Sequence, residues 1–312
     1  REQMRVVFMG TPDFAVPTLL RLISDGHEVA GVFTQPDKPK GRKLELTPSE
    51  VKVCALENGI PVFQPKSLKN GEAIPILNEL KPEVIVVAAY GMLLREDVLS
   101  FPRYGCINAH GSILPKYRGA APIQWAVIDG EKETGVTAMQ MDKGLDTGDM
   151  LLTKTLEIGE DETSGELFDR LSFLAADVIS EVLVLAEKGE LNPVSQDDFE
   201  SSYARMLSKD DCPIDFSEPA SVIHNKIRGL SPWPVAQTQL SGEVFKIHLS
   251  SLTDKKVSED TKPGTIITDK NDLYVSCGDK RLLKLVTVQP KGSKRMSAGD
   301  YLRGHKPGAS FD

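Results

Sequence analysis

The segment EVIVVAAY (Glu83–Tyr90) limits the possible folds most tightly, because nearly all of its residues are apolar or β-branched. Such a run is typical of a parallel strand that helices cover on both faces. RVVFMG (Arg5–Gly10), HEVAGVFT and GCINAH are predicted to be further strands, and a helix is predicted over Asp13–Ser24. Strands and helices therefore alternate through the first half of the chain, which predicts a Rossmann-like, doubly wound α/β domain.

The pattern changes after Gly130. TGVTAMQM and DMLLTKTLEI predict two strands around the turn DKGLDTGD, and helical spacing of apolar residues predicts a long acidic helix over Glu162–Lys188. From about Val244 onward, four short predicted strands alternate with turn residues, as in a small β-barrel or sandwich. Because 312 residues exceed what one hydrophobic core usually serves, we expect two domains. The predicted boundaries are 1–189 and 208–312, with a linker over 190–207.

The charge of the chain is unevenly distributed. A net charge of -8 argues against a nucleic-acid-binding protein when the chain is taken as a whole. The segment Lys38–Lys43, however, carries four positive charges and no negative one, and Arg281–Lys306 is also basic. Because salt screens distant charges within about 10 Å, such a local footprint can bind phosphates on an acidic protein.

The four cysteines lie far apart and form no CxxC pair, which predicts reduced thiols and no zinc site. Reduced thiols fit a cytoplasmic protein. No apolar run approaches the roughly 20 residues of a membrane span, and no signal-peptide pattern is visible at the N-terminus. We therefore expect a cytoplasmic protein with no membrane partner. We also expect a monomer.

The end of the GCINAH strand carries the strongest candidates for chemistry. Asn108 and His110 are two residues apart, so both side chains point the same way in an extended segment. They follow a strand, at the edge where open α/β sheets bind their ligands. Histidine can exchange a proton near neutral pH, and an asparagine amide can donate to a developing oxyanion. An isolated Asn-x-His is nevertheless more often structural than catalytic.

A carboxylate that orients the imidazole would favour catalysis. MDKGLDTGDM offers Asp142, Asp146 and Asp149, of which Asp146 is framed by a glycine-rich turn that could point it inward. A calcium loop is excluded because the later glutamate of such a loop is not at the right spacing. Neither a nucleophile elbow nor a G-x-G-x-x-G fingerprint is present. These features predict a direct group transfer without a covalent enzyme intermediate.

Four stretches carry a family resemblance. The central one, INAHGSILPKYRGAAPIQWAVIDGEKETGVTAMQMDKGLDTGDML, is similar to the 10-formyltetrahydrofolate-dependent formyltransferases. MRVVFMGTPDFAVPTL, IRGLSPWPVA and KRMSAGDYLRG narrow the resemblance to the methionyl-tRNA formyltransferases, in the same order along nearly the whole chain. The resemblance implies formyl transfer from 10-formyltetrahydrofolate to the amino group of methionyl initiator tRNA, with no metal, and an OB-like barrel at the C-terminus.

The resemblance also assigns roles to residues. It implies that Asn108, His110 and Asp146 are catalytic, and that the S-x-L-P segment contacts the folate. That segment comprises Ser112, Ile113, Leu114 and Pro115. Tyr90, Gly91 and Leu94 follow the central strand, at the correct end to line the folate pocket, although core packing would explain them almost as well.

The loop Gln35–Pro48 matches the family segment that meets the acceptor end of the tRNA. Arg42 aligns best with the family's key arginine, and Lys38, Lys40 and Lys43 are the remaining positive charges. GRKLEL is more compact than the usual Gly/Lys-rich loop, which leaves the role of Lys43 open. The roles of Lys116 and Arg118 also stay open, between contact with a substrate and simple solvation.

Two other functions compete. A formyltransferase of the same fold that acts on an amino sugar nucleotide would keep Asn108, His110 and Asp146, but it has no need of the basic loop. A non-catalytic tRNA- or nucleotide-binding protein would not need the complete Asn, His and Asp set. One transfer assay with both kinds of acceptor separates the three.

Overall fold

The computed structural model describes residues 3–312, which form two compact units. Each unit is assembled from separate stretches of the chain. The first contains residues up to Gly119, Thr134–Leu156 and Phe168–Ala204, and the second contains Ala120–Glu133, Glu157–Leu167 and Arg205–Asp312. The domain boundaries expected along the chain (1–189 and 208–312, with the linker 190–207) stay a prediction.

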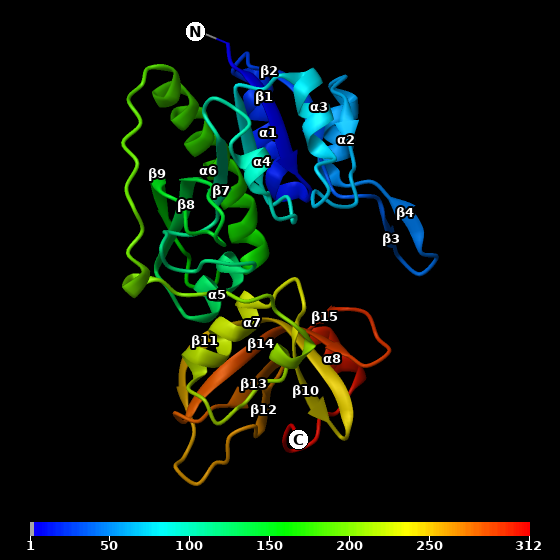
Figure 1. Ribbon diagram of the computed structural model, residues 1–312. Coiled ribbons are helices and arrows are strands. Elements are labelled where there is room, and N and C mark those ends of the chain that lie inside the picture. The colour runs from blue at the N-terminus through cyan, green and yellow to red at the C-terminus, as the bar shows by residue number, and fades with distance from the viewer. Residues whose placement is uncertain (1–2) are drawn as a thin grey trace. The chain divides into compact units, whose positions relative to one another are not determined.

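A seven-stranded sheet forms the centre of the first unit (Figure 1). The strand order is β5-β2-β1-β6-β7-β8-β9. The first five of these strands are parallel, and β8 runs antiparallel to β7. Because the chain winds outward in both directions from the β1–β6 pair, the sheet is doubly wound, as the sequence predicts. The strands are β1 (Arg5–Gly10), β2 (Glu28–Phe33), β5 (Val62–Phe63), β6 (Val84–Ala88), β7 (Cys106–His110), β8 (Glu133–Gln140) and β9 (Met150–Glu157).

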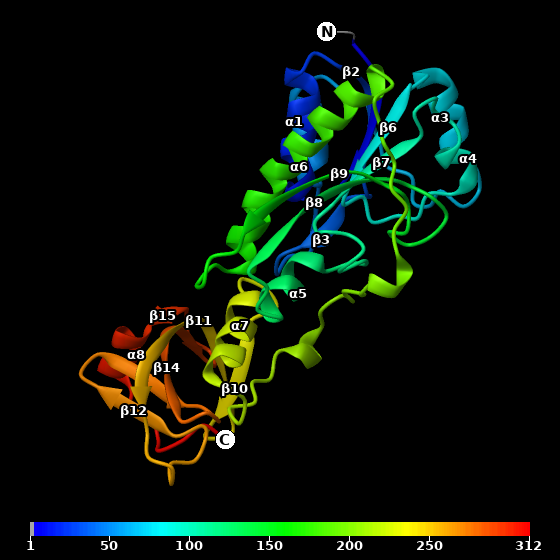
Figure 2. The same cartoon turned by 90° about the vertical axis from the view of Figure 1, so that its left-hand side faces the viewer.

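Helices cover both faces of this sheet. Figure 2 shows α1 and α6 on one side of the strands, with α3 and α4 on the other. The helix predicted over Asp13–Ser24 starts as a 3-10 turn, η1 (Asp13–Ala15), and the long acidic helix predicted from Glu162 is α6. The helices are α1 (Val16–Ser24), α2 (Glu50–Glu57), α3 (Ala73–Leu80), α4 (Glu96–Leu99) and α6 (Ser164–Glu187).

Alternation along the strands places apolar side chains on both faces of the sheet. Val7 and Met9 on β1, with Ile85 and Val87 on β6, pack in the cluster that α3 and α4 cover. The intervening residues are fully buried too, and β6 is buried along its whole length. The prediction that EVIVVAAY supplies a central strand is therefore confirmed, and the polar chemistry is left to the strand ends.

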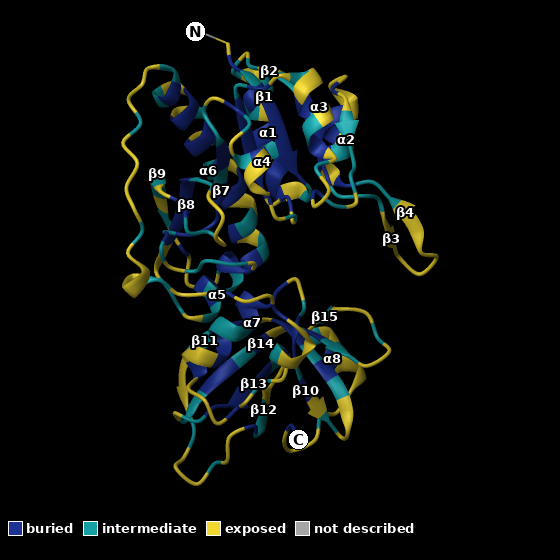
Figure 3. Cartoon of the chain, in the orientation of Figure 1, coloured by how far each residue is buried: buried dark blue, intermediate teal, exposed yellow. Residues whose placement is uncertain are grey.

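The basic loop is more ordered than the sequence suggests. Its residues form a two-stranded hairpin of β3 (Lys38–Lys40) and β4 (Glu45–Thr47), which Figure 1 shows as an arm projecting beyond the sheet. The turn is possible because Gly41 and Leu44 adopt positive φ angles of 74° and 50°. Figure 3 shows the arm as almost wholly exposed, in contrast to the buried strands β1 and β6.

The second unit is an antiparallel β structure, with strand order β10-β11-β14-β13-β12 and with β15 paired to β14. The C-terminal residues link its two edges: Phe311 N donates to Gly264 O (2.9 Å) beside β12, and Asp312 N donates to Gln239 O (2.9 Å) on β10. The antiparallel β structure expected from the sequence is therefore confirmed, and the C-terminal segment ties its two edge strands together. Its elements are α5 (Pro122–Ile128), η3 (Lys209–Asp211), α7 (Ala220–Gly229), β10 (Ala236–Leu240), β11 (Glu243–Lys256), β12 (Ile266–Asp269), β13 (Asp272–Ser276), β14 (Arg281–Pro290), β15 (Met296–Ser297) and α8 (Ala298–Gly304).

Candidate active site

Asn108 and His110 lie at the carboxyl end of β7 in the first unit. Asn108 pairs with Val87 of the parallel strand β6 and with Met139 of the antiparallel strand β8. The intervening Ala109 is buried, so the two polar side chains lie on the same face. Within residues 3–312, the side-chain amide of Asn108 makes no hydrogen bond. The amide is therefore available as a donor.

Two acceptor oxygens flank the imidazole of His110. Its Nε2 lies 2.7 Å from the backbone carbonyl oxygen of Tyr117, and its Nδ1 lies 3.7 Å from Oδ2 of Asp146. A carbonyl oxygen only accepts, so Nε2 carries the hydrogen of that bond. At 3.7 Å the carboxylate attracts a protonated Nδ1 but does not bond to it. Tyr117 therefore orients the ring, and the nitrogen next to Asp146 is the one that can exchange a proton.

Asp146 is the aspartate that the DKGLDTGD turn brings to His110. Its φ angle of +54° lies in the left-handed region, which aspartate tolerates better than most residues. Oδ2 also accepts a hydrogen bond from Gly119 N at 2.8 Å. Asp142, by contrast, caps the turn by accepting from Gly144 N and Thr147 Oγ1 at 2.9 and 2.6 Å. Asp149 is exposed, so only one of the three candidates approaches the imidazole.

The SILP segment is anchored by its own polar groups. The Ser112 side chain is fully buried, and its hydroxyl donates to Lys116 O at 2.7 Å. Leu114 is also buried, and its N–H donates to Thr137 Oγ1 at 3.2 Å. Ile113 and Pro115 are half-buried. Of the four predicted folate contacts, these two are the side chains that a ligand can reach, while Ser112 and Leu114 shape the loop.

The residues after β6 divide in a similar way. The side chains of Tyr90 and Leu94 belong to the apolar core that α3 and α4 cover. Burial raises the pKa of the Tyr90 hydroxyl well above its ordinary value. Gly91 is exposed, with a φ angle of +83°. Thr11 Oγ1 donates to Tyr90 O at 2.9 Å, and Gln35 Nε2 donates to Gly91 O at 2.9 Å. The loops after β1 and β2 therefore hold this backbone next to the β6 end.

The positive side chains of the hairpin point to solvent. Lys40 Nζ lies 3.5 Å from Glu50 Oε1 at the start of α2, in an exposed ion pair. Arg42 and Lys43 occupy the turn at the tip of the hairpin and are exposed, as is Lys38. Leu44 and Leu46, each 71% exposed, add apolar surface to the same arm. The hairpin therefore presents charged and apolar groups together, away from the sheet.

Burial makes a thiol nucleophile at this site unfavourable. Cys106 opens β7, and burial raises the pKa of its thiol to about 12. The thiol therefore stays protonated and unreactive at neutral pH. Within residues 3–312, no group of three His, Cys, Asp or Glu side chains is arranged to hold a metal ion. Over that same range every helix is too short or too polar to cross a membrane.

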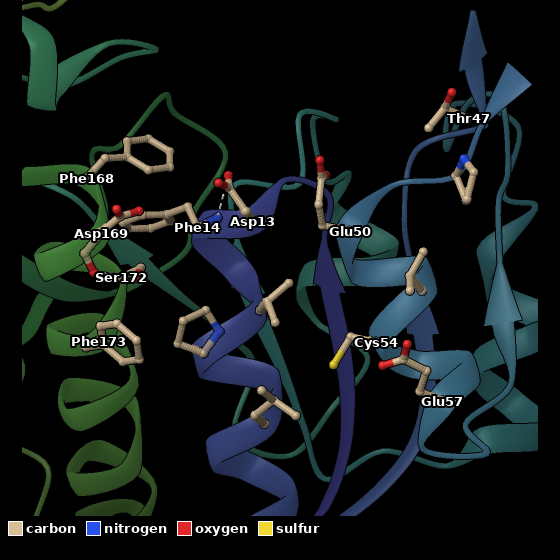
Figure 4. A pocket seen from close by; sticks show the side chains of 15 residues that line it. Asp13, Phe14, Thr47, Glu50, Cys54, Glu57, Phe168, Asp169, Ser172 and Phe173 are labelled. Atoms are coloured by element: carbon tan, nitrogen blue, oxygen red, sulfur yellow. Dashed lines mark hydrogen bonds between the residues drawn. The ribbon is translucent and has the colours of Figure 1, made fainter. Parts of the chain in front are cut away.

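A recess of about 640 Å³ lies elsewhere in the first unit, between α1, α2 and α6 (Figure 4). Its lining is mostly apolar, including Phe14 and Phe173, with carboxylates such as Asp13 and Glu50 at the rim. The lining of this recess does not include Asn108, His110 or any residue of the SILP segment. Its size alone would suggest a ligand site, but its lining offers no donor comparable to those at the β7 end.

Some residues that shape the site had no signal in the sequence. Tyr117 contributes only a backbone carbonyl, and any residue type would supply that oxygen. Gln196 donates to the carbonyls of Asp146 and Gly148, from a segment whose polar composition predicts only a linker. A long-range contact between such a segment and a turn leaves no periodic pattern that the sequence alone could reveal.

Comparisons with known proteins identify the family of the chain. Residues 4–183 match the formyl transferase family model, and residues 206–306 match the model of the formyl transferase C-terminal domain. The methionyl-tRNA formyltransferase of Caldanaerobacter subterraneus subsp. tengcongensis is 50% identical, over 97% of both chains. That of Agathobacter rectalis is 49% identical, over 99% of both chains.

Solved structures share the fold at lower identity. An N-formyltransferase from Helicobacter canadensis, in complex with folinic acid and dTDP-3-aminofucose, superposes with a TM-score of 0.70 at 18% identity, covering 92% of this chain and 100% of that one. HypX from Aquifex aeolicus, in complex with tetrahydrofolic acid, gives a TM-score of 0.67 at 15% identity, over 98% of this chain and 49% of that one. Taken with the near full-length identity above, the chain belongs to the methionyl-tRNA formyltransferase family.

Proposed function

We propose that this chain transfers the formyl group of 10-formyltetrahydrofolate to the free amino group of methionyl initiator tRNA, using Asn108, His110 and Asp146. The observation that carries the proposal is the grouping at the end of β7: an amide donor and an imidazole on one face, with a carboxylate 3.7 Å from Nδ1. The identity of about 50% to curated methionyl-tRNA formyltransferases supports the choice of substrates.

The proposed chemistry is a direct transfer. The amine of the methionyl ester bonds to the formyl carbon, and the Asn108 amide donates to the oxygen on which negative charge develops. His110 accepts the amine proton at Nδ1, and the Asp146 carboxylate stabilises the imidazolium that results. The same proton then passes to the folate nitrogen as the carbon–nitrogen bond to the folate breaks. No covalent bond to the protein is needed, which fits the protonated state of the Cys106 thiol.

We propose two binding regions for the substrates. The folate site is lined by Ile113, Pro115 and the backbone at Gly91. Four buried residues support this lining, namely Ser112, Leu114, Tyr90 and Leu94. Arg42, Lys38, Lys40 and Lys43 of the hairpin contact the phosphates of the tRNA acceptor end. Arginine at the tip supports this assignment because its planar fork suits a phosphate better than the point charge of lysine.

We further propose a cytoplasmic monomer with domains over 1–189 and 208–312. All proposed catalytic groups come from one chain, which supports a monomer. The four cysteines are free and buried, which supports a reducing compartment. Sedimentation of the purified chain, with and without tRNA, checks the stoichiometry.

One assay tests the function. The chain is incubated with 10-formyltetrahydrofolate and two acceptors, methionyl initiator tRNA and a dTDP-linked amino sugar. Formylation of the tRNA with no product from the sugar is expected. Formylation of the sugar alone would favour the rival transferase reading, and binding of tRNA without any transfer would favour a non-catalytic binding protein.

A further inference from the structure

A segment that the sequence presents as a linker is bound to the active-site loops. We call residues 194–204 the strap. At one end, Val194 and Met150 exchange two backbone hydrogen bonds of 2.8 and 2.9 Å. At the other end, Arg118 N donates to Ser202 O at 2.9 Å, and Ala204 N donates to Arg118 O at 2.6 Å. The strap therefore bridges the end of the turn that carries Asp146 and the loop that contacts His110.

Gln196 is the strap residue that reaches the catalytic turn. Its Nε2 donates to Asp146 O at 2.9 Å and to Gly148 O at 2.7 Å, so both hydrogens of the amide hold one turn. These bonds fall at and just after Asp146, whose left-handed backbone conformation is held in place by surrounding contacts of this kind. Gly148 also lies so close to Gln140 O that an added Cβ would stand 1.7 Å away. The turn is therefore bound to the strap by Gln196 and packed closely against the end of β8 at Gly148.

Arg118 holds Gln196 in turn. Its Nε donates to Gln196 Oε1 at 3.0 Å, and its Nη2 pairs with Asp198 Oδ1 at 2.8 Å. The Arg118 side chain is only 11% exposed. These contacts bind the guanidinium to the strap, so Arg118 is not a freely solvated charge. The same loop supplies Tyr117 O to His110 and Gly119 N to Asp146.

We propose that Gln196 is a positioning residue for the formyl transfer: supported by Arg118, it fixes the backbone of Asp146 and thereby the place of the carboxylate beside Nδ1 of His110. The inference rests on the proposed catalytic role of Asp146. It adds to the site a strap residue fifty positions from Asp146 in the sequence, which acts through the Asp146 backbone.

Substitution of Gln196 tests the inference in the full-length chain. Gln196→Ala removes both donors to the turn, and Gln196→Glu removes them while keeping an acceptor for Arg118. Both variants are expected to lose about 10²-fold in kcat, because small displacements of a catalytic group have effects of that order. The KM values for tRNA and folate are expected to change little. Phe199→Ala is the matched control, because this strap side chain is 100% exposed.

A double-mutant cycle separates positioning from a general loss of structure. In an Asp146→Asn background, Gln196→Ala is expected to cost little further kcat, because the group it positions is already disabled. An equal fold-loss in both backgrounds would show a role independent of Asp146 and overturn the inference. So would an unchanged kcat in Gln196→Ala while Asp146→Asn is impaired. A normal kcat in Asp146→Asn would instead overturn the proposed function at this residue, and the inference with it.

Discussion

At the scale of single residues, the Asn108 amide is the simplest group to test. The side-chain amide has no hydrogen-bond partner within residues 3–312, so its replacement removes no internal hydrogen bond. Asn108→Ala is expected to lower kcat by about 10²–10³, the usual effect of losing one oxyanion donor. The melting temperature should stay close to that of the parent. Steady-state formylation kinetics and a thermal scan measure both, and normal turnover would contradict the role given to Asn108.

Two carboxylates four residues apart provide a matched pair. Asp146→Ala removes the charge 3.7 Å from Nδ1 of His110 and is expected to lower kcat by about 10² or more. Asp142→Ala removes the acceptor for Gly144 N and Thr147 Oγ1, so it should lower the free energy of unfolding by about 1 kcal/mol. It should leave kcat near that of the parent. Kinetics and urea unfolding on both variants check this, and the reverse assignment of the two effects would contradict it.

At the scale of elements, the β3–β4 hairpin is the part that the sequence described least well. Alternation of Pro, Gly and charge predicts an irregular loop, because no apolar face marks the strands. The pairing of Lys38 with Thr47 and of Lys40 with Glu45 comes from backbone geometry at the Gly41–Leu44 turn. A hairpin holds its tip at a defined distance from the sheet, which a flexible loop does not.

Charge at the hairpin tip is expected to control the affinity for tRNA. Arg42→Ala should raise KM for methionyl-tRNA more than it lowers kcat, and should reduce the slope of log KM against log salt concentration by about 1. Arg42→Lys should recover part of the affinity, because the charge returns without the planar fork. Lys188→Ala removes one positive charge from an acidic region and serves as the control. A rate insensitive to Arg42→Ala and to salt would count against tRNA contact by the hairpin.

At the scale of the whole molecule, pH is expected to act through two buried histidines of the second unit. Burial lowers the pKa of His224 below 6.5, against an opposing hydrogen bond to Glu160 O. Burial likewise lowers the pKa of His248. Below about pH 6.5 the unfolded chain therefore binds more protons than the folded chain. The contribution of the two histidines to the free energy of unfolding is fully present above that pH. It is lost as the pH falls through their folded pKa values.

Urea unfolding between pH 7.5 and 5 measures this loss, with the fluorescence of Trp125 and Trp233 reporting on the second unit. The slope is expected to be at most about 1.4 kcal/mol per pH unit for each histidine, and smaller in His248→Gln. Asp211, whose pKa the hydrogen bond from Arg205 lowers to about 2, acts only at more acidic pH. Stability that rises on acidification through this window would contradict the prediction.

Local patterns made much of the fold predictable. Apolar runs at β1 and β6 and helical periodicity in α6 each identify an element, because burial imposes a spacing that a sequence displays directly. The same patterns place Asn108 and His110 at a strand end. The conformation of the SILP segment was less predictable, since the burial of Ser112 depends on partners such as Lys116 O, whose position no spacing rule states.

By itself, the sequence determined the doubly wound sheet, the antiparallel C-terminal unit and the family, because alternation, burial and motif order are properties of the chain read along its length. Only the tertiary structure decided which oxygens flank His110, which of three aspartates approaches it, and that the strap supports the site through Gln196 and Arg118. Those features depend on contacts between residues about 35 to 80 positions apart, or on the path of a backbone carbonyl. Such contacts exist only after the chain has folded, and they constrain the catalytic geometry to tenths of an ångström where periodicity constrains only the face of a strand.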